Sequence, residues 1–105
     1  MRTMGQIFLF EGREHFFVVA EGDSMHPKIQ DGDEVLCIKT DRVESGDIAV
    51  ITYDGEGYIR EYNTDGETVT LRPINSAYPE ITVKASDVSR FSILGEAIST
   101  TRKVY

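Results

Sequence analysis

Short apolar stretches separated by turn residues are the feature that most constrains the fold of this chain. Several of them alternate polar and apolar side chains with the period of two that is typical of a strand. Segments with the 3.6-residue period of a helix are short, and only 24–29 and 85–90 fit a single turn each. We therefore expect strands over these segments: 6–10, 15–20, 34–39, 47–53, 57–62, 68–72, 81–83 and 91–98.

Turn-forming residues stand between the expected strands. Glycine accepts a positive φ without strain, and an aspartate side chain hydrogen-bonds to its own backbone in a turn. The clearest hairpin runs from Asp47 to Tyr62 through Asp54-Gly55, and a second follows through residues 63–66 into the stretch 68–72. Many short strands with little helix predict a mostly β fold, a closed β-ribbon or barrel of short antiparallel strands whose closure protects the edges.

Length and charge restrict the chain further. Its 105 residues suit a single domain, residues 1–105. With 18 acidic and 11 basic side chains the net charge is −7, which argues against direct contact with nucleic acid, because phosphates require a basic surface. The apolar stretches are shorter than the roughly 20 residues of a membrane helix. Cys37 is the single cysteine and no export signal is evident, so we expect a cytoplasmic protein without disulfides.

The segment 22–27, Gly-Asp-Ser-Met-His-Pro, interrupts the strand pattern and places Ser24 between a glycine and a proline. Taken alone, these residues are ordinary for a turn. Further blocks follow in order along the chain: Asp31-Gly-Asp-Glu-Val-Leu36, Gly46-Asp-Ile-Ala-Val50, Tyr58-Ile-Arg-Glu-Tyr62, Leu71-Arg-Pro-Ile-Asn-Ser-Ala-Tyr-Pro79 and Ile93-Leu-Gly-Glu-Ala97. Together the blocks cover about Phe16 to Ile98 and resemble the LexA-like (peptidase S24) family of self-cleaving regulators. That family includes phage repressor C-terminal domains and the SOS mutagenesis polymerase subunit.

The resemblance implies the LexA/signal-peptidase-like fold, a homodimer, and a Ser-Lys dyad that cuts the chain's own linker when a recombinase filament stimulates it. Ser24 matches the nucleophile of the family. A serine hydroxyl needs an adjacent base, and in this family the base is a lysine kept neutral by burial. Counting back from the block Asn75-Ser-Ala-Tyr78, the position of the lysine falls on Arg60.

An arginine at this position removes the base. A guanidinium keeps its proton up to a pH of about 12 and carries five donors and no acceptor. We therefore expect Arg60 to donate hydrogen bonds to Ser24 Oγ or to pair with a carboxylate. Either contact preserves the shape of the site while disabling its chemistry, so we expect self-cleavage to be lost.

Other side chains offer weaker alternatives for the base. His26 is two residues from Ser24, but it lies in the same tight turn, where a solvated loop histidine is the simpler interpretation. Lys28, Lys39 and Lys84 look like ordinary surface charges.

Metal and cofactor sites have no support in the sequence. His15, His26 and Cys37 show no metal-ligand spacing, and Cys37 between two aliphatic residues is most simply a core residue. The glycines punctuate hairpins and form no phosphate-binding loop. We expect no metal, no cofactor and no small-molecule ligand.

The family's cleavage site is a second departure. Relatives cut at an Ala-Gly or Cys-Gly bond upstream of the serine, and neither dipeptide occurs in this sequence. Met4-Gly5 is the nearest approximation. Only 23 residues precede Ser24, so we expect either that the chain represents the part downstream of such a bond or that it has no cleavable bond.

Three functions remain open. The first is the C-terminal dimerisation domain of a phage-repressor-like transcription regulator, whose DNA contacts come from a separate N-terminal helix-turn-helix that this chain lacks. The second is an active serine self-protease, and the third is an SOS mutagenesis polymerase accessory subunit. For a homodimer we expect the surface to be strand 91–98, where Phe91, Ile93 and Ala97 share one face. Burial of that face in the core of one subunit explains the pattern equally well.

Overall fold

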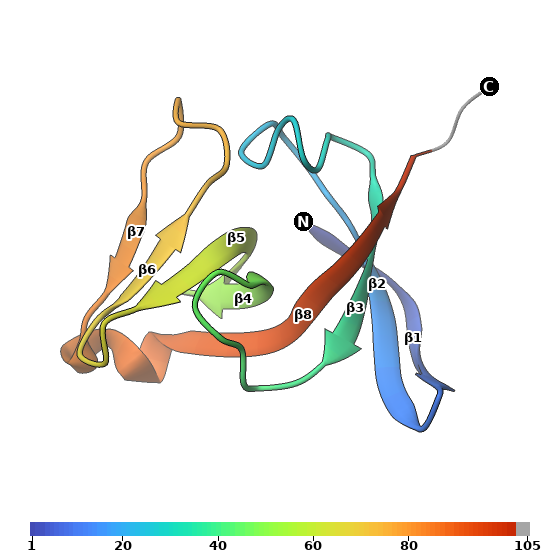
Figure 1. Cartoon of the computed structure of the whole chain (residues 1–105), viewed down its shortest axis with the longest axis horizontal. Coiled ribbons are helices and arrows are strands. Elements are labelled where there is room, and N and C mark those ends of the chain that lie inside the picture. The colour runs from blue at the N-terminus through green and yellow to red at the C-terminus, as the bar shows by residue number, and fades with distance from the viewer. Residues whose placement is uncertain (103–105) are drawn as a thin grey trace.

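The computed structural model describes residues 1–102, apart from the side chain of Met4. It is built almost wholly from antiparallel strands, which confirms the mostly β fold (Figure 1). Within the described residues, no helix is long and apolar enough to cross a membrane. In chain order the elements are β1 (Arg2–Phe10), β2 (Arg13–Val19), β3 (Glu34–Lys39), β4 (Ile48–Tyr53), β5 (Glu56–Thr64), β6 (Val69–Arg72), β7 (Ile81–Val83), the 3-10 helix η1 (Ala85–Arg90) and β8 (Phe91–Thr101).

Most elements lie where the sequence predicts them. β3, β7 and η1 have the expected bounds, and the two expected hairpins form between β4 and β5 and between β5 and β6. The largest difference is β1, which begins at Arg2 and not at Gln6. Residues 2–4 pair with residues 17–19 of β2 although they form no apolar run, so cross-strand pairing extends the strand beyond its hydrophobic pattern.

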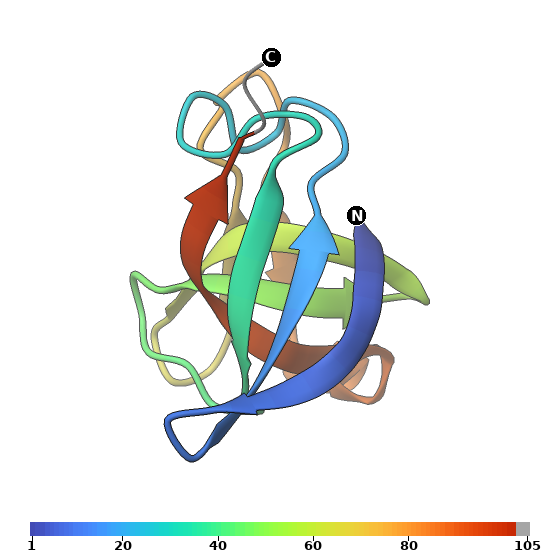
Figure 2. The same ribbon diagram turned by 90° about the vertical axis from the view of Figure 1, so that its right-hand side faces the viewer.

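All eight strands belong to one curled sheet, in the order β1-β2-β3-β8-β4-β5-β6-β7. β8 joins its two halves, because residues 91–96 of β8 pair with β4 while residues 95–101 pair with β3. Figures 1 and 2 show β8 crossing the molecule between these two groups of strands. The sheet is an open half-barrel whose edges are β1 and β7, so it lacks the complete closure expected from the sequence. The shortness of β7 and the register shift between Met4 and Phe8 in β1 limit pairing of these edges with another chain. The end of β1 nevertheless exposes four large apolar residues, Ile7, Phe8, Leu9 and Phe10.

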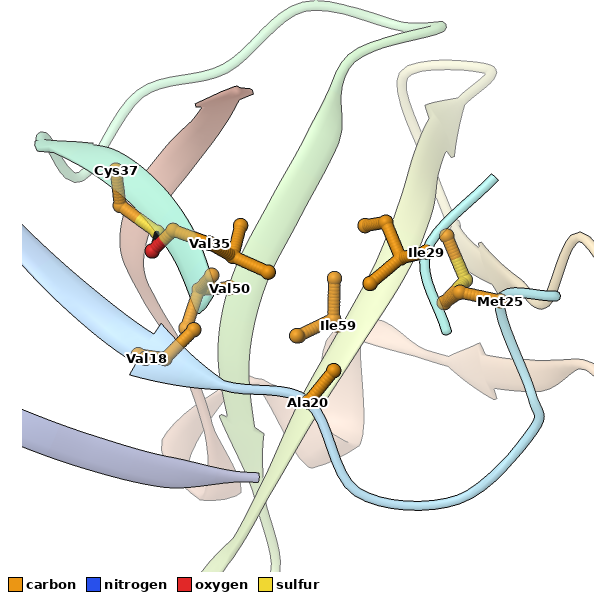
Figure 3. Close-up of a cluster of buried hydrophobic side chains, with 8 residues drawn as sticks. All are labelled: Val18, Ala20, Met25, Ile29, Val35, Cys37, Val50 and Ile59. Atoms are coloured by element: carbon orange, nitrogen blue, oxygen red, sulfur yellow. Dashed lines mark hydrogen bonds between the residues drawn. The ribbon is translucent and has the colours of Figure 1, made fainter. Parts of the chain in front are cut away.

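The sheet has two apolar clusters, the first between its two halves and the second within the half that contains β4, β6 and β7. The strand β4 contributes to both, because Ala49 and Val50 point to opposite faces. Met25 and Ile29 bring the loop after β2 into the first cluster, shown in Figure 3. The first cluster consists of Val18, Ala20, Met25, Ile29, Val35, Cys37, Val50 and Ile59. The second consists of Ala49, Ile51, Leu71 and Val83.

Gly95 stands where β8 passes from one pairing partner to the other. It pairs with Lys39 of β3 and with Val50 of β4. A Cβ atom at this position would lie 2.6 Å from the carbonyl oxygen of Ile38 and 2.8 Å from two ring atoms of Phe16. Only glycine therefore fits at this point of the sheet.

Most apolar side chains of β8 pack against the core of the chain. Phe91 and Ile93 pack against the second cluster, and Ala97 packs against the first. All three residues are partly buried, so this face packs within the chain, and a dimer surface on the same strand stays a prediction. Ile98, which is 45% exposed, is the large apolar residue that β8 presents to solvent.

Candidate functional site

Ser24 lies in a tight turn between β2 and β3. The backbone N–H of His26 donates to the carbonyl oxygen of Asp23 at 3.1 Å, and that of Ile29 donates to the carbonyl oxygen of Met25 at 2.9 Å. The segment thus closes one turn, as its sequence predicts. Met25 and Ile29 are buried in the first cluster (Figure 3), which fixes the turn to the sheet while Ser24 stays partly exposed.

Two other segments hold this turn. The backbone N–H of Asn75 donates to the carbonyl oxygen of Ser24 at 2.9 Å, and the Asn75 side-chain amide donates to the carbonyl oxygen of Asp23 at 3.0 Å. On the other side, the backbone N–H of Gly22 donates to the Asp31 carboxylate at 2.7 Å. The sequence blocks that contain Asp31 and Asn75 therefore meet at the Ser24 turn.

Arg60 reaches Ser24 from β5. Its side chain is buried, with 8% of the residue exposed. Nη1 donates to Ser24 Oγ at 2.8 Å and to the carbonyl oxygen of Ile59 at 2.8 Å. The guanidinium carbon lies 5.1 Å from the ring centroid of Tyr58, a cation-π contact. The fold thus brings Ser24 and Arg60 together across 36 positions of sequence.

The charge of Arg60 is buried without a carboxylate beside it. In residues 1–102, no salt bridge of 4.0 Å or less involves its guanidinium, and its Nε has no hydrogen-bond partner. Burial lowers the pKa of Arg60, and the nearby Tyr58 and Tyr78 offset part of this effect. A guanidinium remains protonated at neutral pH in such a setting, so the Arg60 side chain can donate to Ser24 Oγ but cannot take its proton.

A cavity of about 190 Å³ opens beside this pair. Its walls combine apolar side chains from the first cluster with the polar groups of the Ser24 turn and of β5. The lining residues are Met1, Ala20, Glu21, Gly22, Asp23, Ser24, Met25, Ile29, Gly57, Tyr58, Ile59, Arg60 and Tyr78.

The other candidate bases lie apart from the serine hydroxyl. The His26 side chain is exposed, and within the described part of the chain its ring forms no hydrogen bond with Ser24. Lys28, Lys39 and Lys84 are exposed as well, and the Lys39 ammonium pairs with the Glu14 carboxylate at 3.2 Å.

Cys37 and His15 belong to the packed interior. Cys37 is completely buried in the first cluster, and this burial raises the pKa of its thiol to about 12. His15 is 5% exposed and stacks on Phe8, with ring centroids 5.8 Å apart. Across residues 1–102, no group of three or more His, Cys, Asp or Glu side chains is arranged to hold a metal ion.

Asp33 is a buried charge whose partners sequence reasoning did not find. Its completely buried carboxylate accepts hydrogen bonds from the Gln30 backbone N–H, the Thr100 hydroxyl and the Arg102 guanidinium, at 2.9 to 3.1 Å. Burial raises the pKa of Asp33, but these hydrogen bonds outweigh it and hold the pKa below its ordinary value. In the sequence Asp33 is simply part of an Asp-Gly-Asp turn, because Thr100 and Arg102 lie 67 and 69 positions away.

Known proteins resemble this chain along nearly its whole length. Residues 2–98 match the family model described as Peptidase S24-like. The LexA repressor of Thermotoga petrophila is 38% identical over 98 residues, which are 92% of this chain and 48% of the repressor. For the LexA repressor of Thermotoga maritima the identity is 36% with the same coverage. For that of Myxococcus xanthus it is 30% over 94 residues, 89% of this chain and 42% of the repressor.

The chain spans about half the length of the curated relatives it matches. The match to the family model covers all eight strands almost completely, and it includes the Ser24 turn and β5. The resemblance inferred from the sequence blocks is thereby confirmed, and the chain belongs to the Peptidase S24-like family.

Proposed function

We propose that this chain is the dimerisation and regulatory domain of a LexA-like transcriptional regulator, with a Ser24 site that no longer cleaves the chain. The observation that carries the proposal is the hydrogen bond from Arg60 Nη1 to Ser24 Oγ, 2.8 Å long. The family resemblance puts a lysine base at the position of Arg60. An arginine in contact with the serine hydroxyl occupies the place of the base and lacks its chemistry.

The chemical argument depends on proton transfer. Attack by a serine requires that a neighbouring group accept the hydroxyl proton, and Arg60 has no lone pair available for it. Loss of the base from a nucleophile-base pair lowers the rate by roughly 10⁴- to 10⁶-fold. A self-cleavage reaction slowed to this extent has no regulatory use, so we infer that Ser24 survives as a part of the fold.

The regulatory half of the proposal draws on the relatives. They are named LexA repressors, which favours a repressor over a polymerase accessory subunit. The net charge of −7 disfavours direct DNA contact by this domain. We infer that residues 1–105 form one domain and that a separate helix-turn-helix makes the DNA contacts.

We place the homodimer contact at the C-terminal part of β8, the strand region that the sequence predicts for it. Beyond Glu96, β8 pairs only with β3, so within residues 1–102 its other edge has no strand partner. Ile98 stands beside this edge and is 45% exposed. We expect Ile98→Glu to shift the sedimentation of the chain from dimer to monomer, while Val88→Glu, at an exposed residue of η1, leaves it unchanged. A wild-type chain that stays monomeric at high concentration would contradict the dimer.

The experiment that tests the loss of cleavage adds a cleavable peptide bond to the chain. A fusion chain carries a linker with an Ala-Gly bond ahead of residue 1 and is incubated at alkaline pH, and mass spectrometry follows the appearance of a new N-terminus. We expect no cleavage in the wild-type fusion and slow cleavage in Arg60→Lys. The double variant Arg60→Lys, Ser24→Ala is the control and should be inert. Ser24-dependent cleavage of the wild-type fusion would favour the active self-protease and overturn the proposal.

A further inference from the structure

The Ser24–Arg60 cavity holds a buried positive charge that nothing in the described chain neutralises. Arg60 is more than nine-tenths buried, and it forms no salt bridge within residues 1–102. Nη1 is occupied by Ser24 Oγ and the Ile59 carbonyl, whereas Nε has no hydrogen-bond partner. Burial of an unpaired charge is unfavourable, so an anion beside this guanidinium would be stabilised.

Hydrogen-bond donors converge on the same space. Ser24 Oγ accepts its hydrogen bond from Arg60, so the hydroxyl hydrogen of Ser24 is left to donate. Nη2 of Arg60 forms no hydrogen bond within the described residues, and it is not among the completely buried atoms without a partner. A carboxylate offers two acceptor oxygens to this pair of donors.

The surrounding charges favour an anion with a single negative charge. Glu21 and Asp23 also line the cavity, and both are exposed. Neither lies within 4.0 Å of the guanidinium, and Glu21 lies 3.3 Å from the amino group of Met1. Their negative charges at the rim repel a doubly charged phosphate or a dicarboxylate more strongly than a monocarboxylate.

The walls and the size of the cavity define the rest of the ligand. Met25, Ile29 and Ile59 are buried apolar residues that line it. Its volume of about 190 Å³ is below the roughly 300 Å³ at which drug-sized pockets begin. An acid with a short aliphatic chain fits such a space, with its carboxylate toward Arg60 and Ser24.

We propose that the Ser24–Arg60 cavity binds a monocarboxylate with a short aliphatic chain. The carboxylate belongs either to a free short-chain acid or to the C-terminal residue of a peptide, since both present the same group. The inference rests on the proposed function, because it assumes that the Ser24–Arg60 pair no longer cleaves a peptide bond. The same pair would instead bind a ligand. It also replaces the expectation from sequence that no small molecule binds.

The test is a titration of the isotope-labelled chain followed by nuclear magnetic resonance. The probes are isovalerate, the dipeptide acetyl-Ala-Val and, as the neutral control, isovaleramide, all at matched ionic strength. We expect saturable shifts of the Arg60 side-chain NεH and of the Ser24 and Met25 amides with one or both acids and none with the amide. A preference for isovalerate identifies a free acid as the source, and a preference for acetyl-Ala-Val identifies a peptide end.

Variants connect the binding to the guanidinium. Arg60→Met should weaken binding about tenfold or more, since a charge-assisted hydrogen bond is lost. Ser24→Ala, which removes only a hydroxyl, should weaken it less. Arg42→Met removes an exposed arginine elsewhere and should leave the affinity unchanged. The spectra away from the cavity report whether each variant remains folded.

Several outcomes would overturn the inference. They are equal binding by wild type and Arg60→Met, equal binding of the acid and the amide, or no saturable shift with either acid. In each of these cases the proposed function still stands if the fusion chain described above remains uncleaved. Ser24-dependent cleavage of the wild-type fusion would instead overturn the proposed function and this inference together.

Discussion

The backbone N–H of Asn75 donates a hydrogen bond to the carbonyl oxygen of Ser24 at 2.9 Å, so the loop after β6 is bound to the loop after β2. The Asn75 side chain adds one hydrogen bond between the two loops and one within its own loop. Its amide nitrogen donates to the Asp23 carbonyl at 3.0 Å, and its oxygen accepts from the Ala77 N–H at 3.0 Å. Asn75 is thus a positioning residue for the Ser24 turn.

Replacement of this side chain should loosen the turn. We expect Asn75→Ala to lower the free energy of unfolding by about 1 kcal/mol, because two solvent-exposed hydrogen bonds are lost. Hydrogen exchange of the amides around Ser24 should become faster than in the wild type. Urea denaturation and exchange measurements check both effects, with the exposed neighbour variant Ser76→Ala as the control. Unchanged exchange at the Ser24 turn would contradict the positioning role.

Gly95 leaves no room for a side chain. In Gly95→Ala, the new methyl group would meet the Ile38 carbonyl oxygen at 2.6 Å and the Phe16 ring at 2.8 Å. We expect a loss of about 2 kcal/mol or more, since overpacking at a buried site forces backbone and rotamer shifts. Thermal and urea denaturation measure it against Ser99→Ala, a change at an exposed position of the same strand. Equal stability of the two variants would show that β8 shifts enough to accommodate the added methyl group.

The buried carboxylate of Asp33 makes stability depend on pH. Its pKa is lower in the folded chain than in the unfolded chain, so its contribution is complete above an unfolded pKa of about 4. The contribution is lost as the pH falls through the lower folded pKa. At neutral pH we expect Asp33→Asn to lower the free energy of unfolding by about 2 kcal/mol, through loss of the charge-assisted hydrogen bonds from Arg102.

The measurement is urea denaturation of wild type and Asp33→Asn across a pH series. The difference between the two chains should stay constant from pH 7 to about 5 and should narrow below a pH of about 4. Asp41→Asn, at an exposed aspartate, should show no such difference at any pH. A gap that persists undiminished into strong acid would mean that the Asp33 charge is not what stabilises this contact.

The Cys37 thiol should be inert in the folded protein. Burial raises its pKa to about 12, so at neutral pH its thiolate is roughly three thousandfold scarcer than that of an exposed cysteine with a pKa near 8.5. We expect no labelling by iodoacetamide in buffer and complete labelling in urea. Mass spectrometry measures the extent of labelling. Rapid labelling of the folded chain would show that the first cluster opens readily.

The strands could be predicted locally, but their neighbours in the sheet could not. The alternating residues 34–39 and the Asp54-Gly55 turn define β3 and the β4–β5 hairpin from nearby residues alone. The insertion of β8 between β3 and β4 depends instead on contacts between residues far apart in the chain, and no local pattern encodes them. The same limit explains β1, whose first residues are extended by pairing with β2.

The candidate site was predictable only through the family resemblance. Composition alone describes Ser24 as a turn residue and Arg60 as one of several strand arginines. The order of the sequence blocks put the two together, and the structure places them 2.8 Å apart. The partners of Arg60 were predicted in part: the bond to Ser24 is present, whereas the alternative carboxylate partner is absent within residues 1–102. The lack of a counter-ion is a property of packing in three dimensions.

The shared strand β8 also has a consequence for how the protein is made. β3 and β4 do not pair with each other, and each pairs with β8. During synthesis the seven earlier strands therefore emerge before the strand that unites them. Until residues 91–101 have emerged from the ribosome, the edges of β3 and β4 that will pair with β8 are unpaired. These edges can then pair with other chains. Folding should then finish in a single late step, slowed by the large sequence separation of the pairs that β8 forms.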